Sequence, residues 1–292
     1  MEIKKILAVH DMSCHGAASL GIAIPILTAA GHKVIALPSV ILSSTTDIDQ
    51  DPVALSTTKW MSQVVKRWKK QNLKFDAIYT GWLGDPTQIP IICELCEQPQ
   101  NKNAMVLIDP VMGDNGILYP SQQELAKVIN ELVKHAHVIT PNPTEAALLA
   151  GLLPKDFNIA DDGTIAVEMA HELANALSEQ YPRALSIIKS VVSKNRIGVC
   201  IKYTSDNTAN VKNSVTKEIL GERAPAPSMG GTGDLFASLL IARWLKAEIS
   251  KTSSHVEKNV VIRSVIETMS GMMKSVGVNQ IDLPFRNLLS CN

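Results

Sequence analysis

Short apolar runs alternate with longer amphipathic runs along most of the chain. Residues 33–37 (KVIAL) and 104–109 (AMVLID) are typical of buried strands, whereas residues 121–135 (SQQELAKVINELVKH) have the spacing of a helix. This alternation predicts βαβ units and a mostly parallel sheet with helices on both faces, which is an α/β fold. We expect further strands at residues 3–9, 76–80, 137–140, 184–189 and 197–204, and further helices at residues 52–72 and 164–180.

Two segments near the C-terminus have patterns of their own. Residues 202–223 are polar and predict a hairpin at the sheet edge. A last helix is expected at about residues 254–276, with an apolar stripe that faces the core. The expected stripe consists of Val256, Val260, Val261, Val265, Met269, Met272 and Val276.

Composition limits the possible partners. The 292 residues include 28 Lys and Arg and 28 Asp and Glu, so we expect no nucleic-acid or membrane partner. The apolar segment at residues 16–31 is too short to span a membrane and predicts a loop and a buried helix. Five scattered cysteines, including an isolated C-x-x-C at Cys93 and Cys96, argue against disulfides and structural zinc. A cytoplasmic protein is therefore expected.

Polar and glycine residues follow five successive strands of the expected sheet. They stand at residues 10–16 (HDMSCHG), 38–47 (PSVILSSTTD), 81–85 (GWLGD), 109–116 (DPVMGDNG) and 141–145 (PNPTE). Ligands of such sheets bind outside the carboxyl ends of the strands. A binding crevice is therefore predicted at that end.

The segment GGTGD, residues 230–234, precedes a strongly apolar helix. Its glycines allow successive N–H groups to point the same way, and a helix N-terminus there would add a positive dipole end. Such a turn suits a phosphoryl group in transit, and Asp234 could accept a proton from an attacking alcohol. The alternative role for Asp234 is an ordinary helix cap. The P-loop and dinucleotide glycine patterns are both absent.

Five ordered motifs between residues 6 and 276 together resemble the ribokinase superfamily, and most closely its pyridoxal kinases. The motifs are ALPSVILSSTT (36–46), TGWLGD (80–85), DPVMGDNGILY (109–119), ITPNPTEAALLAG (139–151) and GGTGDLFASLLIA (230–242). The resemblance implies a ribokinase-like three-layer α/β/α sandwich, one kinase domain over residues 1–292, and a homodimer. The implied reaction is transfer of the γ-phosphoryl of ATP to the 5′-hydroxymethyl group of pyridoxal, pyridoxine or pyridoxamine.

The resemblance also implies roles for single residues. Asp234 would be the base, and the N–H groups of Gly231, Thr232 and Gly233 would stabilise the moving phosphoryl group. ATP would contact Asn142, Lys189 and Ser190 together with Gly231 and Thr232, although Lys189 could also merely face solvent. Magnesium would be held near Asp109, Asp114 and Glu145, with Glu145 acting through water. The segment at residues 219–230 could cover the nucleotide.

The resemblance places the substrate ring between the first, second and third strands. The residues concerned are Asp11, Val40, Ser43, Thr46, Trp82 and, in the same loop as Asp11, Cys14. Trp82 replaces the usual tyrosine, and Asp11 stands where many pyridoxal kinases have serine. Because a carboxylate prefers donors, Asp11 keeps a hydroxymethylpyrimidine kinase open as an alternative. A catalytically silent vitamin B6 or nucleotide binding protein is a second alternative.

Overall fold

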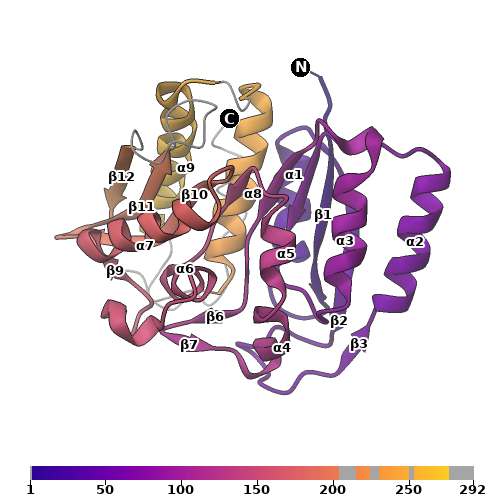
Figure 1. Cartoon of the computed structure of the whole chain (residues 1–292), viewed down its shortest axis with the longest axis horizontal. Helices are drawn as coiled ribbons and strands as arrows, with labels where there is room; N and C mark the ends of the chain where they lie inside the picture. Colours follow the sequence, from indigo (N-terminus) through magenta and orange to yellow (C-terminus); the bar gives the residue numbers. More distant parts are fainter. Residues whose placement is uncertain (1, 204–214, 224–229, 250–252, 276–292) are drawn as a thin grey trace.

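A ten-stranded mixed sheet forms the centre of the molecule (Figure 1). The computed structural model describes residues 2–203, 215–223, 230–249 and 253–275. Within them the strand order is β12-β11-β10-β8-β5-β4-β1-β2-β3, and β9 pairs with β10. The strands from β2 to β10 along this order are parallel, whereas β3, β11 and β12 are antiparallel to their neighbours. The expected mostly parallel sheet is thus confirmed.

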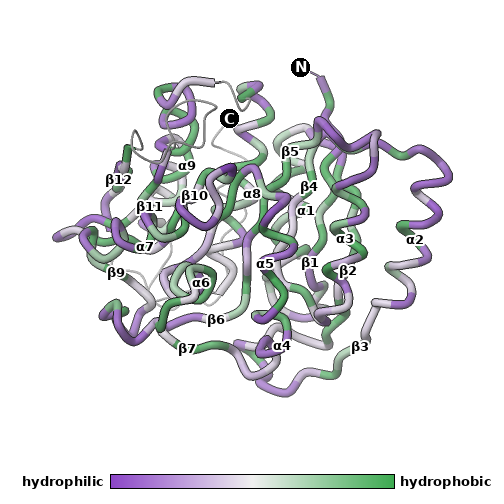
Figure 2. The backbone as a smooth tube through the Cα atoms, in the orientation of Figure 1, coloured by the Kyte–Doolittle hydropathy of each residue, from purple (hydrophilic) through white to green (hydrophobic). Residues whose placement is uncertain are grey.

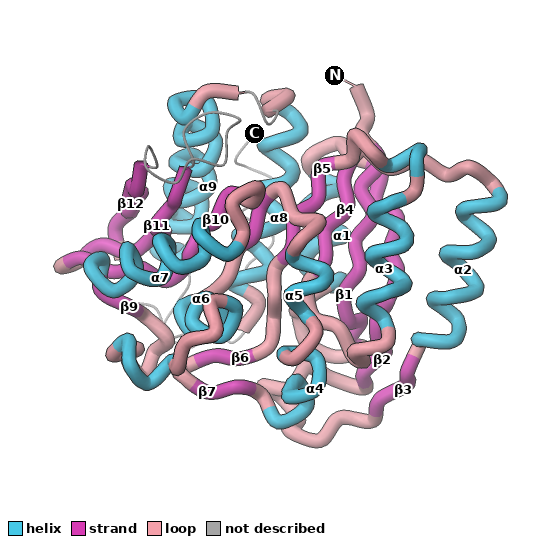
Figure 3. Tube along the Cα trace, in the orientation of Figure 1, coloured by secondary structure: helices cyan, strands magenta, loops and turns pink. Residues whose placement is uncertain are grey.

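The strand bounds agree with most of the expected strands. They are β1 Lys5–Ser13, β2 Lys33–Leu42, β3 Ala54–Ser56, β4 Ala77–Thr80, β5 Met105–Ile108, β8 Val138–Ile139, β9 Ile165–Ala166, β10 Leu185–Ser193, β11 Arg196–Tyr203 and β12 Val215–Glu222. A separate hairpin of β6, Gly113–Asp114, and β7, Ile117–Leu118, lies at the carboxyl ends of the parallel strands (Figure 3).

Helices cover both faces of the sheet and complete the expected three layers. α1, α8 and α9 pack on one face, and α2, α3, α5, α6 and α7 pack on the other (Figure 1). The bounds are α1 Leu20–Ala29, α2 Thr58–Lys70, α3 Gln88–Glu97, α4 Gln123–Ala126, α5 Ile129–Val133, α6 Pro143–Leu149, α7 Val167–Gln180, α8 Thr232–Lys246 and α9 His255–Ser275, with 3-10 turns at Pro99–Asn101, Pro120–Gln122 and Pro154–Phe157.

Alternate residues of β1 enter two separate cores. Leu7 and Val9 belong to the core that includes side chains of α2, α3 and α7, whereas Ile6 and Ala8 belong to the core that includes side chains of α1 and α8. All four are fully buried, because a parallel sheet with two covered faces leaves no exposed side. Figure 2 shows the resulting apolar strands at the centre of the molecule.

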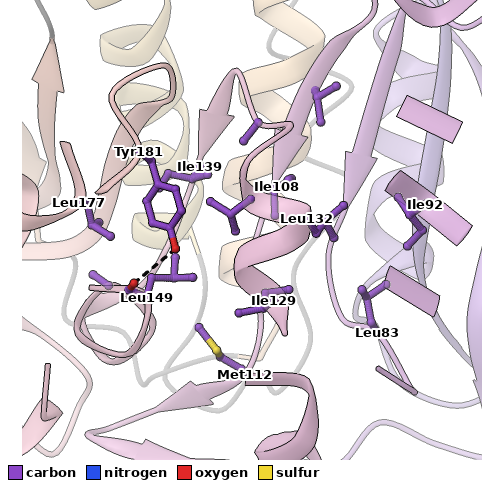
Figure 4. Close-up of a cluster of buried hydrophobic side chains, with 14 of the residues drawn as sticks. Leu83, Ile92, Ile108, Met112, Ile129, Leu132, Ile139, Leu149, Leu177 and Tyr181 are labelled. Carbon is purple, nitrogen blue, oxygen red and sulfur yellow. Dashed lines mark hydrogen bonds between the residues drawn. The ribbon is translucent and has the colours of Figure 1, made fainter. Parts of the chain in front are cut away.

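In the core of Figure 4, the Tyr181 hydroxyl donates a hydrogen bond to the Leu149 carbonyl.

Several element boundaries differ from the expected ones. The helix expected at residues 52–72 begins only at Thr58, because residues 54–56 form the edge strand β3. The helix expected at residues 121–135 is divided into a 3-10 turn, α4 and α5. Residues 165–166 pair with β10 before α7 begins. Short strand pairings of this kind leave little trace in hydrophobic periodicity.

The expected apolar stripe of α9 is only partly correct. Val261, Val265 and Met272 are buried, as expected. Val256 and Val260 are 70% and 63% exposed, because α9 turns a different stripe toward β12 and α8. Val276 lies outside the described residues. The hairpin expected at residues 202–223 is only partly correct: β12 forms the sheet edge, but its antiparallel partner β11 begins already at Arg196, and residues 204–214 lie outside the described part.

Candidate active site

A pocket of about 470 Å³ lies at the carboxyl ends of the parallel strands, beside the N-terminus of α8. All residues expected to bind ATP or magnesium or to act in catalysis line it, namely Asp109, Asp114, Asn142, Glu145, Lys189, Ser190, Gly231, Thr232, Gly233 and Asp234. Side chains from α9, including Ile266, Met269 and Met273, form part of its wall. In the segment at residues 219–230 that was expected to cover the nucleotide, residues 219–222 belong to β12 and residues 224–229 lie outside the described residues, whereas Glu222, Arg223 and Gly230 line the pocket.

The glycine turn has the backbone that the sequence predicts. Gly231 precedes α8 with a φ of 78°, in the left-handed region that favours glycine. A Cβ there would stand 2.2 Å from Cδ1 of Ile22 and 3.0 Å from the carbonyl oxygen of Ala17. Both the conformation and the lack of space therefore require glycine. The N-terminus of α8 is thereby directed into the pocket.

Asp234 occupies the first turn of α8, but its carboxylate does not cap the helix. One oxygen, Oδ2, accepts the backbone N–H of Ser19 at 2.8 Å, and Oδ1 lies 3.1 Å from Nε2 of His10. Burial alone would raise the pKa of Asp234, but His10, the Ser19 N–H and Lys189 together hold that pKa below its ordinary value. Asp234 is thus an ionised carboxylate whose contacts come from β1 and the following loop.

The side chain of Lys189 is only 13% exposed and points into the pocket rather than to bulk solvent. Its ammonium donates to both oxygens of Asp109, at 2.7 and 3.0 Å. A Cβ placed on Gly233 would stand 3.1 Å from the same ammonium, which therefore lies against the glycine turn. Burial tends to lower the pKa of Lys189, but Asp109 and Glu145 outweigh it and raise that pKa. A fixed positive charge consequently stands beside the expected path of the phosphoryl group.

Ser190 follows Lys189 at an irregularity of β10. The pairing register with β11 shifts between Ile188 and Val191, and Ser190 has a φ of 58°. Such backbone strain is often found at functional sites. The irregularity allows Lys189 and Ser190, although adjacent, both to line the pocket.

Asn142 and Glu145 close the pocket at the N-terminus of α6. They form a capping box, in which Asn142 accepts the N–H of Glu145 and Glu145 accepts the N–H of Asn142. Burial raises the pKa of Glu145 to about 8, although Lys189 opposes this effect. Asp114 accepts the N–H of Asn115 and a weaker bond from the Asn142 amide.

The carboxylates of the pocket fit an ion that is held mainly by a nucleotide. Within the described ranges, no group of three or more His, Cys, Asp or Glu side chains is arranged to hold a metal ion unaided. Both oxygens of Asp109 are occupied by Lys189, and Glu145 is engaged by backbone N–H groups. Magnesium bound to ATP commonly takes one or two carboxylates and keeps several waters, which this pocket can provide.

The residues expected around the substrate ring stand apart from this pocket. Asp11 and Val40 are buried and Trp82 is half-buried, whereas the side chains of Cys14, Ser43 and Thr46 are exposed. None of the six lines the pocket; they belong to β1, β2 and the segments that follow β1, β2 and β4. The backbone N–H of Trp82 donates to Nδ1 of His10, and Nε2 of His10 lies 3.1 Å from Oδ1 of Asp234.

Sequence reasoning assigned no role to His10, Tyr119 and Asp162, and it included Arg223 only in the segment at residues 219–230 that could cover the nucleotide. His10 lies between Asp11 and Asp234, and Tyr119, Asp162 and Arg223 line the pocket. Arg223 forms an ion pair with Asp162. The available signal for His10 was its position as the first polar residue after the apolar run of β1. Alternation along a regular strand would place His10 and Asp11 on opposite faces, but a shift of register between His10 and Met12 brings them together.

Comparison with known proteins identifies the family. The model of the family named phosphomethylpyrimidine kinase matches residues 21–279. The chain belongs to this family. The chain is also similar to the pyridoxal kinase of Dictyostelium discoideum, which is 24% identical over 289 residues, with 94% of this chain and 90% of the relative covered. Human pyridoxal kinase is 25% identical, with 80% of this chain and 75% of the relative covered.

Solved structures agree with the fold. A candidate phosphomethylpyrimidine kinase from Bacteroides thetaiotaomicron, crystallised with pyridoxal, is 28% identical with a TM-score of 0.75. The matched region covers 99% of this chain and 95% of the Bacteroides chain. Pyridoxal kinase from Lactobacillus plantarum, at 24% identity, has a TM-score of 0.78 over 99% of this chain and 96% of its own. The expected ribokinase-like sandwich and small-molecule kinase family are therefore confirmed.

Proposed function

We propose that this chain transfers the γ-phosphoryl group of ATP to the 5′-hydroxymethyl group of pyridoxal, pyridoxine or pyridoxamine. The main support is the position of Asp234. Its carboxylate lies at the N-terminal turn of α8, between the pocket lined by the glycine turn and the residues around Asp11 and Trp82. An alcohol bound on one side and a nucleotide on the other would meet at this carboxylate. The pyridoxal kinases among the similar proteins support the choice of acceptor.

The proposed transfer assigns each step to a residue of the chain. Asp234 accepts the proton of the substrate hydroxyl as the O–H bond breaks, and the oxygen forms a bond to the γ-phosphorus. The bond from that phosphorus to the β–γ bridging oxygen breaks, and ADP leaves with the electron pair. The N–H groups of Gly231, Thr232 and Gly233 and the ammonium of Lys189 stabilise the charge in transit.

Magnesium, when bound with ATP, would neutralise phosphate charge in this reaction. We expect Asp114 and Glu145 to face it through water, with Asn142 beside them at the start of α6. Asp109 would act chiefly through Lys189, since both its oxygens already accept from that ammonium. Ser190 would contact the phosphates from the same irregularity of β10.

A hydroxymethylpyrimidine kinase is the second candidate. The family model carries the phosphomethylpyrimidine name, and Asp11 offers a carboxylate that could accept from an exocyclic amine. The chemistry at Asp234 would be the same for both acceptors. The choice therefore depends on the groups around Asp11, Val40, Ser43 and Trp82, with Cys14 and Thr46 at the exposed rim.

The proposal includes a homodimer formed by one kinase domain over residues 1–292 in the cytoplasm. Support for the dimer comes from the edge strand β3, whose outer side has no strand partner among the described residues. Val53 and Leu55 at this edge are 79% and 63% exposed. Sedimentation of wild type and Leu55→Lys tests the dimer: a dimer that the substitution dissociates supports the proposal, and a wild-type monomer contradicts it.

No helix in the described ranges is long and apolar enough to cross a bilayer.

The acceptor is tested by ADP release from Mg·ATP with pyridoxal, pyridoxine, pyridoxamine and hydroxymethylpyrimidine supplied separately, against a blank without acceptor. Turnover with a B6 vitamer well above the pyrimidine supports the proposal, and mass spectrometry should show one added phosphate. A preference for the pyrimidine overturns the acceptor but keeps the transfer chemistry. Absence of turnover, combined with tight binding of pyridoxal, would point to a silent binding protein.

A further inference from the structure

His10 is enclosed between the proposed base and the proposed ring-binding residues. Its side chain is 1% exposed, at the end of β1. Nε2 lies 3.1 Å from Oδ1 of Asp234, whereas Nδ1 accepts the Trp82 N–H at 3.0 Å and lies 3.2 Å from Oδ1 of Asp11. Nε2 therefore faces the proposed base, and Nδ1 faces two of the proposed ring-binding residues. The imidazole thus connects these two parts of the site.

Two neighbours fix the orientation of this ring. The Tyr79 ring packs edge-on against it, with ring centroids 5.6 Å apart and an angle of 78° between the planes. Gly81 provides the space, because a Cβ at that position would stand only 1.6 Å from Nε2 of His10. The glycine after β4 is therefore needed by the histidine.

Nε2 carries a proton in each protonation state that fits these contacts. The backbone N–H of Trp82 points to Nδ1, so a neutral ring has its proton on Nε2, whereas a charged ring has protons on both nitrogens. Burial disfavours the charged ring, but Asp234 at Nε2 and Asp11 at Nδ1 outweigh burial and raise the pKa of His10 to about 10.

We propose that His10 is a positioning residue for phosphoryl transfer, in which Nε2–H holds the Asp234 carboxylate ionised and directed toward the acceptor hydroxyl. This inference rests on the proposed function. The other oxygen of Asp234 accepts the Ser19 N–H, so the imidazole and this N–H contact different oxygens of the carboxylate. Without the imidazole, burial would favour the protonated carboxylic acid, which cannot accept a proton.

The kinetic test compares His10→Leu with His10→Gln. Leucine removes the donor, so kcat should fall about 10²-fold, the loss expected for a misplaced reacting group. The KM for ATP should change little, and the acid limb of the pH profile of kcat/KM should move to higher pH. Glutamine places an amide N–H near the position of Nε2 and should restore most of kcat. Gly81→Ala should reproduce the leucine effect by displacing the ring.

His32 provides a matched control. It is also a buried histidine, but its Nε2 contacts the carbonyl of Ala242, outside the pocket. His32→Gln should leave kcat and the pH profile as in wild type. If His10→Leu shows wild-type kcat and an unmoved acid limb, the inference is wrong, whereas the proposed function stands.

A spectroscopic measurement decides the inference independently of turnover. In ¹⁵N-labelled protein, long-range ¹H–¹⁵N spectra should show a proton on Nε2 of His10 at pH 7, and Asp234→Asn should shift that signal. A ring protonated on Nδ1 alone, or a signal insensitive to Asp234→Asn, would overturn the inference. These outcomes hold even for a chain that phosphorylates none of the acceptors tested, which would instead contradict the proposed function.

Discussion

The ammonium of Lys189 lies 2.7 and 3.0 Å from the two carboxylate oxygens of Asp109, and this pair joins the irregularity in the middle of β10 to the end of β5 beside Gly233. Only 13% of the Lys189 side chain and 1% of the Asp109 side chain are exposed. The pair therefore supplies a charge at the glycine turn at a position fixed before ATP binds.

Lys189→Met should affect both the rate and the stability. Loss of the cation should lower kcat by about 10²–10³-fold, the range for one electrostatic donor. The Asp109 carboxylate would remain buried without its partner, so the free energy of unfolding in urea should fall by about 3–5 kcal/mol. The double variant Asp109→Asn/Lys189→Met should recover stability but not kcat. Recovery of both would show that Lys189 is only structural.

Gly231→Ala should destabilise the protein and impair turnover. The φ of 78° and the 2.2 Å approach to Cδ1 of Ile22 leave no room for a methyl group. A loss of about 1–3 kcal/mol is expected from the backbone strain alone. Gly271 in α9 is the matched control, because nothing lies within 4 Å of a Cβ placed there. Gly271→Ala should stabilise the helix by about 0.5–1 kcal/mol.

Glu145 should release a proton when Mg·ATP binds at pH 7. Its pKa of about 8 means that the ligand-free carboxyl group is mostly protonated there, and a nearby divalent cation favours the ionised form. Titration calorimetry in buffers of different ionisation enthalpy measures this release. The release should vanish in Glu145→Gln and at pH 9, and its persistence in Glu145→Gln would assign it to another group.

The same group should affect stability without ligand. Because folding raises the pKa of Glu145 from 4.5 to about 8, the folded state binds more protons than the unfolded state between these values. The free energy of unfolding should therefore decrease as pH rises from about 4.5 to 8. Urea unfolding of wild type and Glu145→Gln across this range should show a smaller pH dependence in the variant.

Trp82→Leu should raise the KM for the B6 vitamer and leave the KM for ATP nearly unchanged. The residue lies just after β4, outside the pocket. The substitution would therefore remove a flat aromatic ring from the proposed acceptor site and leave the nucleotide pocket unchanged. Trp60 on α2, which is 49% exposed, provides the control substitution Trp60→Leu. Equal effects on both KM values would place Trp82 in another role.

The architecture and half of the site could be predicted from the sequence because both rest on local patterns. Alternation of apolar runs gave the parallel sheet, and polar residues after the strands located the pocket at its carboxyl ends. The glycine turn and Asp234 appeared as one continuous motif. Asn142 and Glu145 likewise stand at capping-box spacing, which is visible without a structure.

What escaped prediction depends on contacts between distant segments. His10 pairs with a residue that lies 224 positions later in the chain, through a strand irregularity that periodicity does not reveal. The sequence alone left open whether Lys189 faces solvent, because only the structure shows Asp109 beside it. The exposed Val256 and Val260 are a further example, because the apolar pattern of α9 does not show which of its sides packs against the rest of the protein.

Single-turnover phosphorylation of pyridoxal by Asp234→Asn is the most direct test of the account. The substitution keeps the size of the side chain but removes the base, so the rate should fall by about 10²–10⁴-fold. Binding of ATP should persist, and Asp156→Asn, at an exposed site, should react as wild type does. A rate for Asp234→Asn close to that of wild type would contradict the claim that Asp234 accepts the substrate proton.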